Sequence, residues 1–182
     1  KTAYEIGVRL VGSEMCIRDR VLSACASAML LYGFALIYAA TSELSYAGIG
    51  AKGAQAYGEN PMLIMAGSAM VLAGIGFKLS VAPFHMWTPD VYEGAPTPVT
   101  GFLATVSKGA VFVALSRFYI DGALYQYNSL NTALVFLAIA SMLVGNWLAL
   151  RQENIKRLLA YSSIAHFGYL LVVLIALTYL ET

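Results

Sequence analysis

The sequence has little charge and few of the residues that build cofactor and metal sites. Only 12% of its 182 residues are charged, and a formal net charge of +1 gives no indication of a nucleic-acid partner. Two cysteines, Cys16 and Cys25, cannot form a metal site by themselves and are interpreted as ordinary thiols. The sequence contains no glycine-rich phosphate loop, no CxxC pair and no histidine-rich cluster. We therefore expect no metal and no organic cofactor in this chain.

Apolar residues are the most abundant class in the sequence. They make up 59% of the chain, and the mean hydropathy is +0.70, whereas soluble domains contain about 45–50% apolar residues. A membrane-spanning helix needs about 20 such residues. The sequence therefore predicts an all-α, polytopic membrane helix bundle with about five transmembrane helices and a loop over residues 41–60. The predicted helices are Val21–Ala40, Met62–Phe77, Pro98–Tyr119, Asn131–Leu150 and Ile155–Tyr179. Asn131 is a suitable cap for the fourth helix, and Asn154 caps the fifth.

The first twenty residues differ from the rest of the chain. They carry seven of the 21 charged side chains and lack the long apolar run of a signal peptide. The string EMCIRDR at 14–20 looks like a translated sequencing-library adapter. We interpret residues 1–20 as a non-native segment and residues 21–182 as a transmembrane fragment, cut before Val21 and also after Thr182. The alternative is a short amphipathic leader.

The second apolar segment predicts a broken helix. Asn60 is a suitable cap, and Pro61 suits the first helical position. Lys78 follows the apolar run, and Pro83 then removes an amide donor and disturbs the helix. The sequence therefore predicts one discontinuous helix with its break near Lys78–Pro83. Non-helical backbone at membrane depth survives only inside protein or beside water, so a hydrated interior site is expected there.

Two lysines lie inside apolar segments. Lys108 is about ten residues from either end of its segment, about 15 Å along a helix, which makes snorkelling to an interface hard. Lys78 is about sixteen residues in, about 24 Å, a depth that alone would permit snorkelling. The neighbouring break argues against that alternative. Ionisable residues in the membrane are usually functional because they are costly to insert.

His166 is the third candidate. It lies twelve residues into the last predicted helix, after Tyr161, Ser162 and Ser163. Histidine titrates near neutral pH, which suits a proton relay, and the alternative is a structural, hydrogen-bonded histidine. His85 and Asp90 are expected to shape the polar turn or to line an entry.

The five predicted spans also set the topology. Alternating directions place the Phe84–Pro96 turn and the Arg151–Arg157 loop on one face. The cations of that loop favour the cytoplasm by the positive-inside rule.

Two intramembrane lysines suit vectorial proton transfer. A lysine that has lost its hydration can take up and release a proton near neutral pH. Charge on one lysine disfavours charge on the other, so the pair couples. Waters and hydroxyls such as Ser80, Thr105 and Ser107 are expected to bridge the gap. The proposed site residues are Lys78, Lys108 and His166.

Residues 77–108, FKLSVAPFHMWTPDVYEGAPTPVTGFLATVSK, closely resemble a known family. The family is the antiporter-like subunit N of proton-pumping NADH:quinone oxidoreductase, respiratory complex I. Residues 154–171 and 30–44 support the resemblance, which covers about residues 21–180. The pattern K-x₄-P-x-H-x-W-x-P-D also occurs in subunits L and M and in cation/proton antiporter subunits. The string TPDVYEG at 88–94 favours subunit N.

The resemblance implies the central part of a larger helix bundle in a bacterial inner membrane. Its broken-helix lysine falls on Lys78, the lysine of the next helix on Lys108, and His166 on the same hydrophilic axis. It implies a proton-translocating subunit whose partner subunits hold NADH, flavin, iron–sulfur clusters and quinone. It also implies contacts with other membrane subunits and with lipid. The family's earlier glutamate and later ionisable residue are absent here. The alternatives are a sodium/proton antiporter subunit and a non-conducting membrane scaffold.

Overall fold

Most of the described chain is helical. The computed structural model describes the backbone of residues 3–180 and the side chains of residues 20–177. Between residues 3 and 180 there is no β-strand, which confirms the predicted all-α class. The elements, in chain order, are α1 (Ala3–Thr41), α2 (Tyr46–Glu59), α3 (Pro61–Leu79), α4 (Thr88–Gly94), α5 (Thr97–Phe102), the π-helix η1 (Leu103–Ser107), α6 (Lys108–Asp121), the 3-10 helix η2 (Leu124–Gln126), α7 (Asn128–Ala149) and α8 (Ile155–Leu180).

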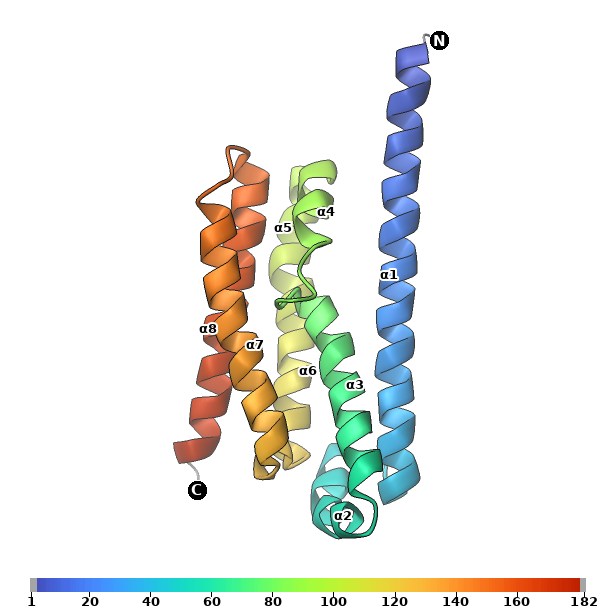
Figure 1. The fold of residues 1–182 in the computed structure, drawn as a ribbon, viewed down its shortest axis with the longest axis vertical. Coiled ribbons are helices and arrows are strands. Elements are labelled where there is room, and N and C mark those ends of the chain that lie inside the picture. The colour runs from blue at the N-terminus through green and yellow to red at the C-terminus, as the bar shows by residue number, and fades with distance from the viewer. Residues whose placement is uncertain (1–2, 181–182) are drawn as a thin grey trace.

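Five helical segments are long and apolar enough to cross a membrane, which confirms the predicted number of spans. The chain is therefore a multi-pass membrane protein. Helix α1 packs along α3, and α7 packs along α8 (Figure 1). Helix α3 contacts α7, which joins the two pairs, and α6 also packs against α3. The spans are Arg20–Thr41, Pro61–Leu79, Thr97–Asp121, Asn128–Ala149 and Ile155–Leu177.

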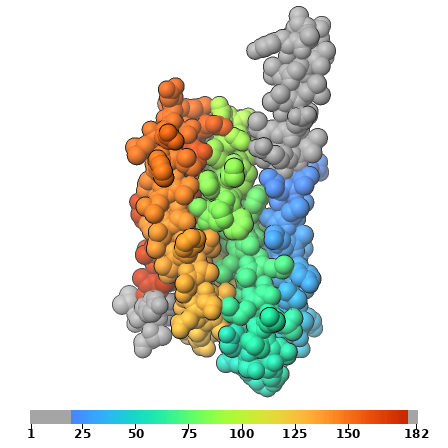
Figure 2. All heavy atoms as spheres, in the orientation of Figure 1, coloured from blue at the N-terminus to red at the C-terminus, as the bar shows by residue number. Residues whose placement is uncertain are grey.

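The crossing of α1 and α3 depends on two glycines. A Cβ added at Gly33 would lie 2.7 Å from the carbonyl oxygen of Gly67, and one added at Gly67 would lie 2.9 Å from that of Gly33. Small residues allow helix backbones to approach in this way. In Figure 2, atoms of α7, of α3 with α4, and of α1 form adjoining columns across one face.

The prediction that residues 1–20 are foreign to the fold concerns side chains that, apart from Arg20, lie outside the described residues. It stays a prediction.

The prediction of a loop over residues 41–60 was wrong, because most of it forms α2. Ser45 caps this helix by accepting a hydrogen bond from the Gly48 amide at 3.1 Å. The buried residues Ile49, Gly53 and Ala56 recur at helical spacing. Glycine and alanine made the segment look irregular, but packing against a bundle outweighs a weak intrinsic propensity.

The predicted break after Lys78 is confirmed. Helix α3 ends at Leu79, and Ser80 adopts a left-handed conformation with φ of 62°. An irregular segment containing a cis peptide bond between Ala82 and Pro83 then leads to the seven residues of α4. Pro61 occupies the first turn of α3 as expected, but the Asn60 side chain makes no capping hydrogen bond.

The third span contains a π-helix that the sequence did not predict, since η1 lies directly before Lys108. One expected cap needed correction. Asn131 does not cap the fourth span, because α7 begins at Asn128. Its side chain instead accepts a hydrogen bond from Tyr119 and donates one to the carbonyl of Tyr125. The expected cap of the fifth span is present: Asn154 Oδ1 accepts from the Lys156 amide at 3.0 Å.

Candidate functional site

The side chain of Lys108 is buried between three helices. Only 3% of the residue is exposed, although it carries an amine. Its Nζ donates a hydrogen bond to Ser163 Oγ on α8 at 3.0 Å. The same nitrogen lies 5.4 Å from the ring centroids of Tyr92 on α4 and Phe167 on α8. Aromatic faces stabilise a nearby cation, so this pocket accepts both the charged and the neutral amine.

Ser163 is placed to receive that hydrogen bond. Its own hydroxyl hydrogen is donated to the carbonyl of Ala160 at 3.0 Å, which leaves the oxygen lone pairs facing Lys108. Tyr92 is 1% exposed, so its hydroxyl is shielded from solvent. Burial raises the pKa of the Tyr92 hydroxyl, with a smaller opposing effect from Ser163. The immediate contacts of the amine are therefore neutral groups.

The π-helix η1 sets the start of α6. Leu103–Ser107 adopt the wider π-helical spacing, and Lys108 is the first residue after them. Thr105 Oγ1 donates to the carbonyl of Gly101 at 2.8 Å, which satisfies one of the backbone groups near this segment. Single π turns within α-helices occur frequently at functional sites. The apolar periodicity of the segment did not indicate this feature.

Lys78 lies in a different environment. It is half-buried in the last turn of α3, where the helix dipole favours a cation. It borders a cleft of about 480 Å³ between α1, α3, α4 and the α5–α6 segment. The cleft is lined by Arg20, Ser23, Phe77, Lys78, Trp87, Val91, Ser107 and Val111.

Lys78 and Lys108 do not line the same cleft, although Ser107, the residue before Lys108, lines the cleft of Lys78. Ser107 borders the cleft of Lys78, and the next residue, Lys108, points its amine at Ser163 on α8. Lys108 itself does not line this cleft. Of the expected bridging hydroxyls, Ser107 reaches the cleft and Ser80 accepts a hydrogen bond from Thr88.

The backbone of the break is satisfied by side chains from two directions. The amide of Ala82 donates to Ser141 Oγ on α7 at 3.0 Å. Trp87 Nε1 donates to the carbonyl of Phe77 at 3.0 Å, and the two rings stack with centroids 5.6 Å apart. Such partners are what permit irregular backbone at membrane depth. The sequence suggested neither contact.

His166 lies on the exposed side of α8, away from the pocket around Lys108. Its Nδ1 is 3.5 Å from Ser162 Oγ, and its ring centroid is 6.3 Å from that of Tyr169. Tyr169 in turn accepts a hydrogen bond from Asn146 Nδ2 at 3.3 Å. Within residues 20–177 the structure therefore gives His166 no direct contact with either lysine, and its partner Ser162 is the sequence neighbour of Ser163, the partner of Lys108.

His85 lies in the irregular segment, half-buried, with its ring centroid 6.5 Å from that of Tyr161. Burial lowers the pKa of this imidazole from its ordinary value of 6.5. At neutral pH the neutral form is therefore favoured.

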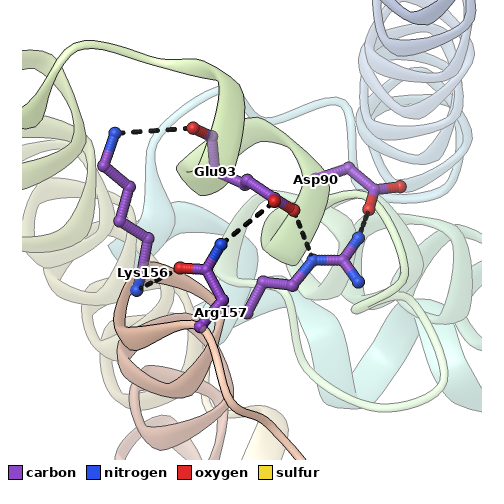
Figure 3. Close-up of polar contacts among 5 residues, drawn as sticks. Asp90, Glu93, Lys156 and Arg157 are labelled. Carbon is purple, nitrogen blue, oxygen red and sulfur yellow. Dashed lines mark hydrogen bonds and ion pairs between the residues drawn. The ribbon is translucent and has the colours of Figure 1, made fainter.

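A polar clamp joins α4 to the first turn of α8 (Figure 3). Arg157 pairs with both Asp90 and Glu93, with 2.6 Å between Nε and the Glu93 carboxylate. Lys156 Nζ donates to the carbonyl of Ala95 at 2.9 Å, and Asn154 Nδ2 donates to Glu93 at 3.0 Å. Sequence reasoning missed this clamp. A signal existed: two carboxylates three residues apart and a basic cluster were predicted on the same face.

The same contacts confirm that the Phe84–Pro96 turn and the Arg151–Arg157 loop share one end of the bundle (Figure 1). The cytoplasmic assignment of this end stays a prediction.

Comparison with known proteins agrees with the fold and with the sequence motifs. The model of the family described as NADH:quinone oxidoreductase/Mrp antiporter, transmembrane, matches residues 9–181. NADH-quinone oxidoreductase subunit N of Ectopseudomonas mendocina (strain ymp) is 55% identical over 163 residues, which cover 90% of this chain and 32% of that protein.

Two solved structures have the same arrangement of helices. A chain of respiratory complex I from Thermus thermophilus with bound aureothin has a TM-score of 0.74 and 44% identity, over 88% of this chain and 34% of that one. A chain of the membrane-bound sulfane sulfur reductase, an archaeal respiratory membrane complex, has a TM-score of 0.77 and 30% identity, over 89% of this chain and 33% of that one.

This chain spans about a third of the length of the relatives that it matches. The resemblance to subunit N found in the sequence is confirmed by these matches. With its five spans, its broken helix and a family match that covers nearly all of its residues, this chain belongs to the NADH:quinone oxidoreductase/Mrp antiporter transmembrane family.

Proposed function

We propose that this chain is part of a membrane subunit that moves protons within an NADH:quinone oxidoreductase. Partner subunits hold NADH, flavin, iron–sulfur clusters and quinone, and this chain carries no redox site. Neighbouring membrane subunits and lipid cover its outer helices. The similarity to subunit N supports this assignment.

The observation that carries the proposal is the burial of Lys108. An ionisable side chain at mid-span costs at least about 2.5 kcal/mol on insertion scales, so a lysine there needs a function. Its contacts with Ser163, Tyr92 and Phe167 are all to neutral groups. Among the side chains of residues 20–177, no carboxylate forms an ion pair with it. A fixed anion would hold the proton on the amine, whereas neutral partners allow it to be released.

Proton movement then requires three steps in this chain. Water in the cleft beside Lys78 supplies a proton to that amine. Transfer to Lys108 passes the α5–α6 segment at Ser107, by way of water that the cleft admits. A positive charge on one lysine raises the free energy of protonating the other. A change in the electrostatic field from another part of the complex would then drive the transfer in one direction. His166 receives or supplies protons on the far side of α8, through Ser162 and Ser163.

A sodium/proton antiporter subunit is the second candidate, because the family description includes Mrp antiporters. The string at 88–94 and the 44% identity with the Thermus complex I chain favour the first. A non-conducting scaffold would have no need for a buried lysine at mid-span. Replacing external sodium by choline separates the first two candidates, since proton pumping by the first does not depend on sodium.

The test is NADH-driven proton uptake by vesicles that contain the full-length subunit in the assembled complex. We expect Lys108→Ala to lower uptake by about 100-fold, the usual size of a lost proton-transfer group. Lys52→Ala, on the surface at the other end of the bundle, is the matched control and retains uptake. Native gels report assembly, which survives in Lys108→Ala because removing a buried charge relieves its desolvation cost. An assembled Lys108→Ala complex that pumps at the wild-type rate would overturn the proposal.

A further inference from the structure

The position of α4 is not determined by the helix before it. Eight irregular residues, from Ser80 to Trp87, separate α4 from α3, and α4 itself has only seven residues. A helix of two turns has little stability of its own. Its position therefore depends on tertiary contacts, and its most extensive packing is against α8.

The clamp supplies polar contacts at both ends of α4. Asp90 is in the first turn and Glu93 in the last, and Arg157 of α8 pairs with both carboxylates. Lys156 donates to the carbonyl of Ala95, the residue that caps the C-terminus of α4, where a cation is favoured. A bridged network of this kind holds geometry better than an isolated surface ion pair.

Tyr92 lies between the two clamped carboxylates in the sequence and forms one wall of the pocket around Lys108. Tyr92 is 1% exposed, and its ring centroid is 5.4 Å from Lys108 Nζ. The other contacts of the amine, Ser163 and Phe167, come from α8, the helix that carries the clamp's cations. The clamp therefore links the two elements that together enclose the amine.

We propose that Arg157 is a positioning residue: by bridging Asp90 and Glu93 it holds α4 against α8 and so keeps Tyr92 packed on Lys108. This inference rests on the proposed role of Lys108 as a proton carrier. Arg157 itself does not take part in proton transfer. Opening the clamp frees α4, withdraws Tyr92 from the amine and lets water reach it outside the transfer path.

The experiment measures proton uptake per assembled complex, with NADH oxidation by uncoupled vesicles measured in parallel. We expect Arg157→Gln to lower uptake about fivefold, the usual size of an effect transmitted through packed neighbours. Glu93→Gln should lower it similarly, and Arg157→Lys should restore part of the loss because it keeps one ion pair. Lys52→Gln, which breaks the ion pair of 2.7 Å with Glu43 in another part of the bundle, is the matched control and should leave uptake unchanged.

A double-mutant cycle distinguishes positioning from general stability. If Arg157 acts through Tyr92, Arg157→Gln should cause no further loss of proton uptake in a Tyr92→Ala background. The two residues need not touch for this result, because the clamp acts through the position of α4. Additive losses, or losses that follow the amount of assembled complex alone, would overturn the inference. Wild-type uptake by both Arg157→Gln and Glu93→Gln would also overturn the inference. If Lys108→Ala still loses proton uptake in the same assay, the proposed function remains intact. Full uptake by Lys108→Ala would instead remove the function on which the inference rests.

Discussion

Lys108, the first residue of α6, donates a hydrogen bond of 3.0 Å to Ser163 on α8, fifty-five residues further along the chain. This buried polar contact joins α6 to α8. It also gives the amine a partner that is neutral and that lies next to Ser162, the neighbour of His166. The following predictions concern this contact and the broken helix beside it.

Lys108→Arg should impair pumping nearly as much as Lys108→Ala. Arginine stays protonated in proteins, so it can occupy the pocket but cannot release its proton. The guanidinium is also larger than the ammonium that fits between the rings of Tyr92 and Phe167. NADH-driven proton uptake by vesicles is the measurement. Pumping by Lys108→Arg at the wild-type rate would show that this position needs only a positive charge.

Ser163→Ala should reduce pumping by about fivefold, because one net hydrogen bond is worth about 1 kcal/mol. The amine of Lys108 would remain buried but lose the oxygen that accepts from it. Ser116→Ala is the matched control, since the Ser116 hydroxyl donates to the carbonyl of Phe112 within its own helix, at 2.9 Å. Equal rates for the two serine variants would contradict the role given to Ser163.

Ser141→Ala should destabilise the broken helix. Ser141 is fully buried and accepts the hydrogen bond of the Ala82 amide, and Ala82 itself is only 3% exposed. An unsatisfied buried donor costs about 1–3 kcal/mol. Hydrogen–deuterium exchange of the intact complex should show faster exchange across Ser80–Trp87. Thr132→Ala, at an exposed hydroxyl of the same helix, should leave that exchange unchanged.

Cysteines placed at Glu93 and Gln152 should react with a membrane-impermeant reagent from the same side. The contacts of Asn154 and Lys156 with the α4 segment require these positions to share one end of the bundle. A cysteine at Lys52, in α2, should react from the opposite side. Basic residues in the loop before α8 predict that the shared side is the cytoplasm. Labelling of positions 93 and 152 from opposite sides would contradict the five-span arrangement.

Much of the fold follows from local sequence patterns. Runs of about 20 apolar residues can be satisfied in lipid only as helices, so the five spans were predictable without tertiary information. Pro83, five residues after Lys78, predicted the break because proline lacks the amide donor of a helix. Lys78 and Lys108 were identifiable as candidates because charge inside such a run is costly.

Other features depended on tertiary packing, and local patterns alone did not determine them. Helix α2 forms in a glycine-rich segment because its buried face packs on the bundle, and η1 has no periodicity signal of its own. The partner of Lys108 could not be predicted, since Ser163 and Ser162 are equivalent as sequence. Only the rotation of α8 turns Ser163 toward the amine and places Ser162 beside His166 on the other side. Residue type and hydrophobic periodicity therefore determined which charges enter the membrane, whereas helix packing decided which groups surround each of them, because side-chain neighbours depend on the relative rotation and spacing of whole helices.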